Sequence, residues 1–316
     1  MSKRILVTGA GGFVGTYLIK ELQKEQGNEI YGAVYKSTSD LSGLLPSDHI
    51  ISGDLTDFAF AKSLIESSRP DVVYHLAAIS IVHNSVDNAL QVMHANTAVS
   101  YNILQALRQY APSARFIAIC SANEYGAVRD GSQPISETTP LRPLNPYAVS
   151  KVTQEMLALE YHLSYDLDVV MLRPFNHTGP GQTTDFVIPM LVKQFVAIQN
   201  VAEPVITVGN LDSVRDFTDV EDMVKAYVLA GKLGVSGEVY NIGSGQGYAV
   251  RQIITLLQDL TGLQVEIKSN PAQLRASDVP VLVADTTKFR TLTGWQPKIE
   301  LSDTLSRILE YTKTNK

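Results

Sequence analysis

The sequence predicts an α/β protein with a doubly wound parallel sheet and a smaller mixed α/β lobe. In the first half of the 316-residue chain, short apolar runs alternate with amphipathic stretches, and after about residue 176 this rhythm changes. Strands that are apolar on both faces and separated by helices are typical of parallel sheets covered by helices on both sides. Right-handed crossovers then determine most of the topology.

The expected elements follow in chain order. Strands are predicted at residues 5–7, 30–34, 49–51, 71–74, 116–119 and 169–172, and helices at 17–26, 59–67, 89–110 and 147–165. The later region is predicted to hold helices at 186–199, 220–231 and 250–261 and strands at 205–208, 238–242 and 264–267. Because the helix and strand within 220–242 can return to the sheet, we expect two discontinuous domains. They comprise residues 1–176 plus about 216–243, and about 177–215 plus 244–316.

Composition and charge narrow the classes of function. The formal net charge is −6, which disfavours nucleic-acid binding, because such proteins usually carry a basic face. The longest apolar stretch, residues 72–82, is too short to span a bilayer, and the N-terminal apolar run ends in glycines, unlike a signal peptide. Cys120 is the single cysteine, so no intrachain disulfide can form. We expect a cytoplasmic protein in which this thiol is buried in a strand rather than a nucleophile.

A glycine-rich turn follows the first expected strand. Gly9, Gly12 and Gly15 have a G-x-x-G-x-x-G spacing, and a helix is expected directly after them. Glycine permits a tight turn and a close approach of the backbone to a pyrophosphate, and the N-terminus of a helix attracts phosphate. The sequence therefore predicts a dinucleotide site that also includes Phe13 and Val14. A plain glycine-rich connector remains the alternative.

The ends of the next strands supply further candidate cofactor contacts. Lys36 follows the second strand, where an acidic residue would bind a free ribose 2′-hydroxyl and a cation would bind a 2′-phosphate. This residue favours NADP(H) over NAD(H), unless it is only a solvated surface lysine. Asp54-Leu55 is suitably placed to meet adenine, and Leu76-Ala77-Ala78 offers small residues beneath the ribose and nicotinamide. Either segment could also be a plain strand end.

The candidate reaction centre is the segment around Tyr147 and Lys151, which share one helical face at positions i and i+4. A phenol titrates near ~10, and a nearby ammonium favours phenolate, so we expect Lys151 to lower the pKa of Tyr147 and create a general acid/base. Ser121 follows the fifth strand, at the sheet edge where ligands bind, and its hydroxyl could bond a substrate carbonyl. Asn96 could support a proton relay, and a role in helix packing is equally compatible with its position.

These motifs together resemble one enzyme family. The glycine triad, Leu76-Ala77-Ala78, Ser121, Tyr147 with Lys151, and Arg173-Pro174-Phe175-Asn176 are similar to those of the extended short-chain dehydrogenases/reductases that modify nucleotide sugars. The resemblance covers nearly the whole chain and implies a Rossmann fold. Residues 175–182, 208–217 and 270–280 are similar to family members that reduce GDP-4-keto-6-deoxy-mannose to GDP-rhamnose with NADPH. The resemblance implies that Tyr147 protonates the alkoxide, Lys151 holds the nicotinamide ribose, and Ser121 polarises the ketone.

The same resemblance assigns contacts in the smaller lobe. It implies that Lys193, Arg215 and Arg275 hold the diphosphate and ribose of a GDP-linked sugar, and arginine's planar fork suits phosphate oxygens. Phe175 and His177 are implied on the cofactor side. The remaining implied substrate contacts are Asn123, Glu124, Asn176, Val187 and Asp278. The histidines show no metal-ligand spacing, and we predict no metal site.

One departure from the family separates reaction types. Related sugar dehydratases carry Thr-Asp-Glu or a similar set after the fifth strand, whereas this chain has Ser121-Ala122-Asn123. Alanine and asparagine cannot donate and abstract the protons that loss of water requires, so dehydration is disfavoured. We expect Glu124 to cap the turn or face solvent. A 4-epimerase or 4,6-dehydratase of the same family, and a dinucleotide-sensing regulatory protein without turnover, remain the alternatives. The family also implies a homodimer formed through the helices of Asn96 and Tyr147.

Overall fold

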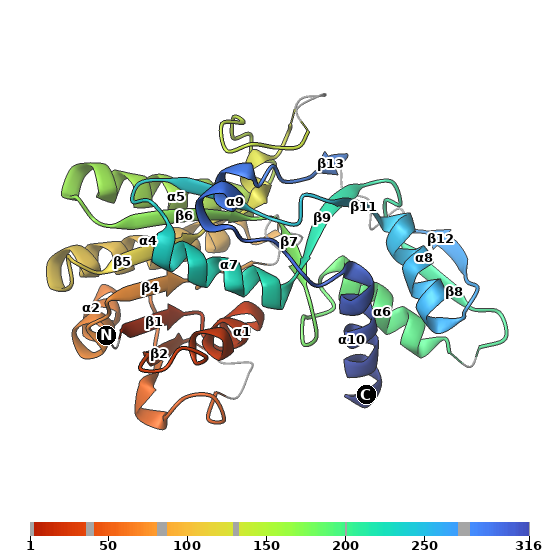
Figure 1. Cartoon of the computed structure of the whole chain (residues 1–316), viewed down its shortest axis with the longest axis horizontal. Coiled ribbons are helices and arrows are strands. Elements are labelled where there is room, and N and C mark those ends of the chain that lie inside the picture. Colours follow the sequence, from red (N-terminus) through yellow and green to blue (C-terminus); the bar gives the residue numbers. More distant parts are fainter. Residues whose placement is uncertain are drawn as a thin grey trace.

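A seven-stranded parallel sheet forms the centre of the larger part of the molecule (Figure 1). The computed structural model describes residues 3–35, 41–80, 87–128, 133–199, 201–270 and 279–315. The strand order is β10-β6-β5-β4-β1-β2-β3. The strands are β1 (Arg4–Thr8), β2 (Glu29–Val34), β3 (Ile50–Ser52), β4 (Val72–His75), β5 (Arg115–Ile119), β6 (Val169–Pro174) and β10 (Val239–Ile242). The predicted doubly wound parallel sheet is confirmed.

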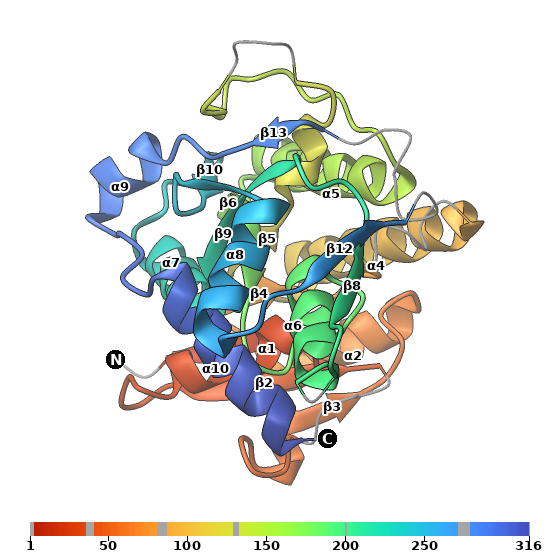
Figure 2. The same ribbon diagram turned by 90° about the vertical axis from the view of Figure 1, so that its right-hand side faces the viewer.

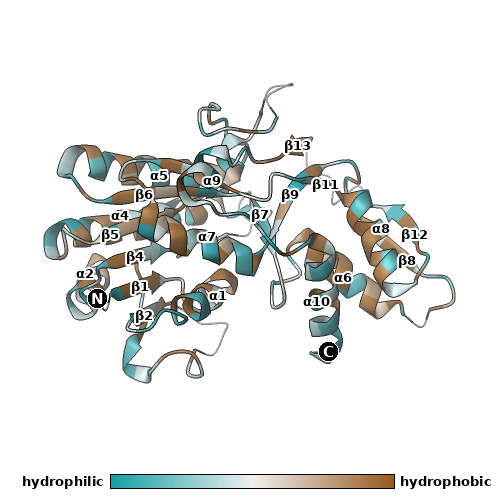
Figure 3. Cartoon of the chain, viewed as in Figure 1, coloured by the Kyte–Doolittle hydropathy of each residue, from teal (hydrophilic) through white to brown (hydrophobic). Residues whose placement is uncertain are grey.

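Helices cover both faces of this sheet because its strands are apolar on both sides. Ile5 and Val7 of β1 pack into one core, whereas Leu6 between them packs into the other. The first core lies under α1 (Phe13–Leu22) and α7 (Val220–Leu233). The second lies under α2 (Phe58–Ser68), α4 (Ala89–Tyr110) and α5 (Pro146–Tyr165). Figure 3 shows the resulting apolar residues along the strands.

The smaller lobe lies at the other end of the molecule in Figure 1 and faces the viewer in Figure 2. Its helices α6 (Val187–Ala197), α8 (Val250–Thr261) and α10 (Leu301–Thr314) bury a third core, which includes Phe195, Ile253 and Ile308. Strand β8 (Val205–Val208) pairs with β12 (Glu266–Ser269) beside these helices. Strand β9 (Val214–Asp219) pairs with β7 (Asn176–Thr178), β11 (Gly247–Ala249) and β13 (Val281–Leu282).

The prediction and the structure differ mainly in this second half. Helix α7 and strand β10 return the chain to the large sheet, whereas the predicted domain boundaries stay a prediction. Strands β7, β9, β11 and β13 and helices α9 (Thr287–Thr293) and α10 are absent from the sequence prediction. Strands β7 and β11 have three residues each and β13 has two, β9 carries two aspartates, and their partners are distant in sequence. Helix α10 was detectable, because its buried Leu301, Leu305 and Ile308 have helical spacing.

Among the described helices, none combines the length and the apolarity that crossing a bilayer requires.

Candidate active site

A cavity of about 1480 Å³ lies where the carboxyl ends of the sheet strands meet the smaller lobe. Open α/β sheets bind ligands at this edge. Most residues that the sequence singles out line it, and they come from both parts of the fold. They are Gly9, Gly12, Phe13, Val14, Gly15, Asp54, Leu55, Leu76, Ala77, Ala78, Asn96, Ser121, Asn123, Tyr147, Lys151, Phe175, Asn176, His177, Val187 and Arg215.

The glycine turn between β1 and α1 has no room for side chains at two positions. Gly9 has φ +68°, and a Cβ there would lie 2.9 Å from the backbone nitrogen of Ala77. A Cβ at Gly15 would lie 2.5 Å from the carbonyl oxygen of Gly9. Gly12 precedes α1, and no side chain caps the helix at this end. The turn therefore presents backbone and a helix N-terminus to the cavity, an arrangement that suits an anionic group.

A buried histidine fixes the ends of β1 and β4 next to this turn. The Nδ1 atom of His75 lies 2.9 Å from the hydroxyl of Thr8, which also accepts the N–H of Ala77 at 3.2 Å. The Nε2 atom of His75 lies 3.2 Å from the Ser100 hydroxyl. Burial, with a smaller contribution from the charge of Lys151, lowers the pKa of His75 to about 3. His75 is therefore neutral and holds the backbone beneath the cavity.

Asn96 joins the segment after β4 to helix α5. Its Oδ1 accepts the backbone N–H of Ile79 at 2.8 Å, and its Nδ2 donates to the carbonyl of Ile79 at 3.2 Å. The same Nδ2 also donates to the Ser150 hydroxyl at 2.9 Å. Asn96 lines the cavity, but its amide atoms already hold protein groups. This geometry favours the packing alternative over the proton relay.

Helix α5 begins where the sequence indicates, and this start sets the position of Tyr147. The Oδ1 atom of Asn145 accepts the N–H of Ala148 at 2.8 Å, and Pro146 occupies the first turn, where its missing N–H is not needed. Tyr147 and Lys151 then lie buried on one side of the helix.

The expected lowering of the Tyr147 pKa by Lys151 is not seen in this structure, where burial dominates. Burial raises the pKa of Tyr147, a hydrogen bond with the Ser121 side chain lowers it in part, and the charge of Glu124 raises it. The ammonium of Lys151 instead donates to the carbonyl of Ile119 at 2.7 Å and to Oε1 of Gln154 at 2.9 Å. Burial lowers the pKa of Lys151. At neutral pH the phenol is therefore protonated, and Ser121 is its polar neighbour.

The turn η2 (Ala122–Tyr125) presents Ser121 to the cavity. The hydroxyl oxygen of Ser121 accepts the backbone N–H of Asn123 at 3.2 Å and its side-chain Nδ2 at 3.2 Å. Glu124 closes the turn from the other side, because its Oε1 accepts the Ser121 N–H at 2.9 Å. These bonds form a capping box, which fixes the local backbone.

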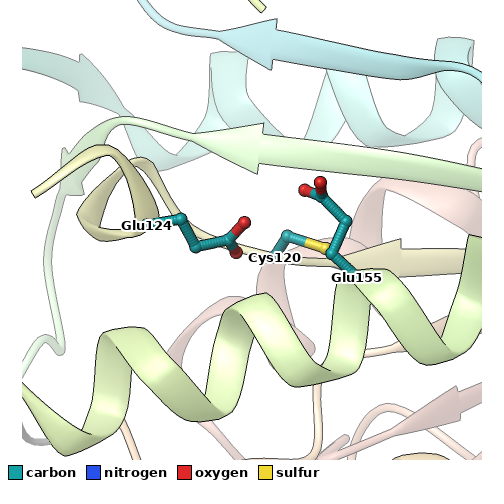
Figure 4. A group of neighbouring side chains, drawn as sticks. All are labelled: Cys120, Glu124 and Glu155. Carbon is teal, nitrogen blue, oxygen red and sulfur yellow. The ribbon is translucent and has the colours of Figure 1, made fainter. Parts of the chain in front are cut away.

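Glu124 caps the turn, which is one of the two roles expected from the sequence. It neither faces solvent nor lines the cavity, so the implied substrate contact is not seen. It is buried beside Cys120 and Glu155, and Figure 4 shows these three side chains gathered between β5, η2 and α5. Arg173 supplies the cation for the two carboxylates. Its Nη2 lies 2.5 Å from Oε1 of Glu155, and its Nε lies 3.7 Å from Oε2 of Glu124.

The cluster holds more acid than the guanidinium neutralises. Burial and the neighbouring Glu155 raise the pKa of Glu124 well above its usual range, and Arg173 lowers it only in part. These surroundings favour the protonated form of Glu124, whose side chain caps the turn. Cys120 is buried as predicted, and burial raises the pKa of its thiol.

The lobe contributes cavity residues through β7 and β9. The ring of His177 stacks on Phe13 at a centroid distance of 6.5 Å, and burial lowers its pKa. Arg215 is half-buried at the cavity and donates to the carbonyl of Val214 at 2.9 Å. Lys193 is exposed on α6 and is not among the lining residues, and its implied contact with a diphosphate stays a prediction. Lys36, Arg275 and Asp278 lie outside the described residues.

Tyr227 and Gln182 are among the cavity residues to which the sequence prediction assigned no role. Tyr227 of α7 is buried and reaches the cavity, and its hydroxyl has no partner among the described residues. Gln182 lines the cavity and donates to the carbonyl of His177 at 3.1 Å. Tyr227 carries no sequence signal, because it lies on the apolar face of an ordinary amphipathic helix.

Comparison with known proteins gives consistent matches over the whole chain. The family model described as GDP-mannose 4,6 dehydratase matches residues 6–308. The GDP-6-deoxy-D-mannose reductase of Pseudomonas aeruginosa is 34% identical over 312 residues, which cover 98% of this chain and 97% of that protein.

Two solved structures extend the match to three dimensions. The structure of RMD from Pseudomonas aeruginosa complexed with NADPH has a TM-score of 0.87 and 30% identity, covering 99% of this chain and 100% of that one. The UDP-glucose 4-epimerase of Thermus thermophilus, in complex with NAD, has a TM-score of 0.86 and 27% identity, with 98% of each chain covered. Similarity of fold therefore extends to both reductases and epimerases.

Proposed function

Since the chain belongs to the GDP-mannose 4,6-dehydratase family, whose members are oxidoreductases and epimerases of the extended short-chain type, we propose that it is an NADPH-dependent reductase. Its proposed reaction converts the C4 keto group of GDP-4-keto-6-deoxy-D-mannose into the hydroxyl of GDP-D-rhamnose. The observation that carries the proposal is the turn after β5. There Ser121 and Asn123 line the cavity beside Tyr147, while the only acid of the turn, Glu124, is buried elsewhere.

The glycine turn fits a nicotinamide dinucleotide. At Gly9 and Gly15 a Cβ would collide with backbone atoms, so both positions require glycine. The absence of side chains lets a pyrophosphate approach the backbone of the turn and the N-terminus of α1. Asp54 and Leu55 would meet the adenine end, and Leu76 to Ala78 would lie beneath the ribose and nicotinamide. When bound, the cofactor supplies the hydride. Preference for NADP(H) over NAD(H) rests on Lys36 and on the similarity to a reductase complexed with NADPH.

The protein groups supply the proton and hold the ketone. Ser121 donates a hydrogen bond to the C4 carbonyl oxygen, which makes that carbon more electrophilic. Tyr147 then donates its phenolic proton to the oxygen as it becomes an alkoxide, so that C=O ends as CH–OH. Reduction needs this phenol in its protonated form, and burial raises its pKa accordingly. Lys151 would hold the nicotinamide ribose from the buried end of the cavity.

The sugar nucleotide would lie toward the lobe. Arg215 is the described cation of the cavity that suits a diphosphate, and Asn123, Asn176 and Val187 line the same space. Dehydration would require an acid and a base that reach the sugar, whereas the cavity positions of the turn are Ala122 and Asn123. This pair argues against a dehydratase.

Two further alternatives differ from the reductase in what they do with the cofactor. A 4-epimerase would keep its cofactor bound and return it to the starting oxidation state, and the similarity to an epimerase in complex with NAD favours it as the second candidate. A dinucleotide-sensing protein would bind the cofactor without turnover. The buried Ser121–Tyr147 pair at the cavity favours an enzyme.

We also propose a homodimer through α4 and α5. Both helices expose large apolar side chains, including Leu90 at 88% and Leu163 at 71% exposure. Exposed apolar groups in this number favour burial against a partner. Sedimentation equilibrium of the purified chain gives the oligomeric state directly.

The reaction is tested by mixing purified protein, NADPH and GDP-4-keto-6-deoxy-D-mannose and following loss of the absorbance of the reduced cofactor. Parallel assays use NADH as reductant and dTDP- or UDP-linked keto sugars as substrates. Tyr147→Phe removes the proton donor and should lower kcat by about 10²- to 10⁴-fold, while NADPH binding measured by fluorescence stays unchanged. Wild-type turnover in this variant would reject the assignment of Tyr147. A sugar product epimerised without net oxidation of NADPH would instead indicate the epimerase.

A further inference from the structure

The hydroxyl of Ser121 is held in an unusual way by a single neighbour. Its oxygen accepts both the backbone N–H and the side-chain Nδ2–H of Asn123, each at 3.2 Å. A serine hydroxyl has two acceptor lone pairs and one donor hydrogen. Both acceptor positions are therefore filled, and the remaining capacity of this hydroxyl is to donate its own hydrogen.

The direction of that hydrogen follows from the surroundings. Ser121 is only 6% exposed, and its polar neighbour on the cavity side is the phenol of Tyr147. Asn123 holds the hydroxyl oxygen from the side of the turn, so the hydrogen of Ser121 is left to point into the cavity that Tyr147 also lines. A carbonyl oxygen beside Tyr147 is an acceptor without a hydrogen of its own, so it matches a serine that can only donate.

We propose that Asn123 is a positioning residue, which fixes Ser121 as a hydrogen-bond donor whose single hydrogen points into the cavity beside Tyr147 and is received by the carbonyl oxygen of the sugar when the sugar is bound. The substrate part of this inference rests on the proposed reductase function. Asn123 acts through Ser121, because its side-chain amide donates to that hydroxyl.

The amide of asparagine is essential to this role. An ionised aspartate at residue 123 has the same shape but offers only acceptors. It would accept the hydrogen of Ser121 and turn the hydroxyl away from the cavity. The backbone would stay in place, because the capping bond from the Ser121 N–H to Glu124, at 2.9 Å, does not involve the side chain of Asn123. From the sequence, Asn123 is expected only as a substrate contact, and nothing in the sequence indicates that its amide donates to Ser121.

The kinetic test compares Asn123→Asp with Asn123→Ala in the NADPH assay with GDP-4-keto-6-deoxy-D-mannose. Asn123→Asp should lower kcat by about 10- to 100-fold, the range expected when a charged group captures a hydrogen bond, while the Kd for NADPH stays unchanged. Asn123→Ala removes one donor but adds no competing acceptor, so its loss should be smaller, about two- to fivefold. Equal kcat values for Asn123→Asp and the wild type would overturn the proposal.

A double-mutant cycle shows whether Asn123 acts through Ser121. In a Ser121→Ala background there is no hydroxyl to orient, so adding Asn123→Asp should change kcat by less than about twofold. A loss as large as in the wild-type background would mean that Asn123 affects the substrate or the fold directly, and the positioning role would be rejected.

A measurement that needs no catalytic turnover distinguishes failure of this proposal from failure of the proposed reductase function. Neutron diffraction from crystals of the wild-type protein in heavy water locates the deuterium of the Ser121 hydroxyl. We expect it to point toward Tyr147 or into the cavity, and a deuterium directed at Asn123 would overturn the proposal. If no keto sugar oxidises NADPH, the reductase function fails, whereas the deuterium position still decides the orientation of Ser121.

Discussion

Two buried acids of this molecule, Glu124 below the reaction centre and Asp216 in strand β9, are satisfied in opposite ways. Asp216 accepts four hydrogen bonds: Oδ1 from the backbone and hydroxyl of Ser244 at 2.8 and 2.5 Å, and Oδ2 from the N–H groups of Gly245 and Ala284 at 2.8 and 3.2 Å. Glu124 accepts one N–H on Oε1, and its Oε2 has no hydrogen-bond partner among the described residues.

The difference shows how the same chemical group serves two purposes. Burial raises the pKa of both acids, but the four donors around Asp216 oppose this shift, whereas a second carboxylate beside Glu124 adds to it. Asp216 thus acts as an acceptor that ties strand β9 to the turn at residues 244–245 and to Ala284 after β13. The surroundings of Glu124 instead favour its protonated form, and Arg173 pairs with the neighbouring Glu155 at 2.5 Å.

The largest effect is expected when the cation of the Glu124 cluster is removed. Arg173→Met leaves Glu155 and Glu124 without a cation in a buried space, and it also removes the bond of Arg173 to the Tyr125 hydroxyl at 2.9 Å. Breaking a buried ion pair on one side typically costs about 3–5 kcal/mol of unfolding free energy. Urea denaturation measures this loss. A loss below about 1 kcal/mol would mean that the cluster is already neutral without Arg173.

An intermediate loss of unfolding free energy is expected for Asp216→Asn. The amide has one oxygen, so its nitrogen must face either the donors of Ser244 or those of Gly245 and Ala284. Leaving such buried donors without an acceptor costs about 1–3 kcal/mol. The same urea titration measures it, with Asn210→Ala in a neighbouring turn of the lobe as a comparison. An unfolding free energy equal to that of the wild type would mean that Asp216 does not need both carboxylate oxygens as acceptors.

The smallest effect is expected for Glu124→Gln at acidic pH, below about 4.3, where the wild-type acid is protonated in both the folded and the unfolded chain. The glutamine Oε1 can still accept the N–H of Ser121, and its amide takes the position of Oε2, which has no hydrogen-bond partner among the described residues. At this acidic pH we expect the unfolding free energy to change by less than about 1 kcal/mol, since no buried group loses a partner.

The pH dependence of this variant gives a sharper comparison. An acid whose pKa is raised on folding adds stability below its ordinary pKa, and this contribution is lost as the pH rises through the raised value. Glutamine does not titrate, so Glu124→Gln should become more stable relative to the wild type as the pH rises above about 4.3. Urea titrations across this range measure the difference. A difference that shrinks with rising pH would show that Glu124 is ionised in the folded protein.

Much of the fold and the outline of the site could be predicted from local patterns. The alternation of Ile5, Leu6 and Val7 between two cores is visible as an apolar run, and the glycine spacing after it is visible as a turn. The contacts of Lys151 could not be predicted, because they depend on the carbonyl of Ile119, which only the packing of α5 on β5 brings within reach.

Dependence on tertiary packing also explains why local sequence patterns do not indicate some elements and contacts. Strand β9 contains Asp216 and Asp219, residues that disfavour strands, and it forms because donors from distant loops and strands pair with it. Lys193 has a charge suited to phosphate, but the face of α6 that carries it is exposed.

Sequence alone determined what depends on neighbours along the chain: the period of the strands and helices, the glycine turn, and the i, i+4 placement of Tyr147 and Lys151. The tertiary structure decided which polar groups meet: Ser121 with Tyr147, Asn123 with Ser121, and Glu124 with Glu155 and Arg173. The reason is physical, because a pKa and a hydrogen-bond direction depend on burial and on partners that are brought together only when the chain folds.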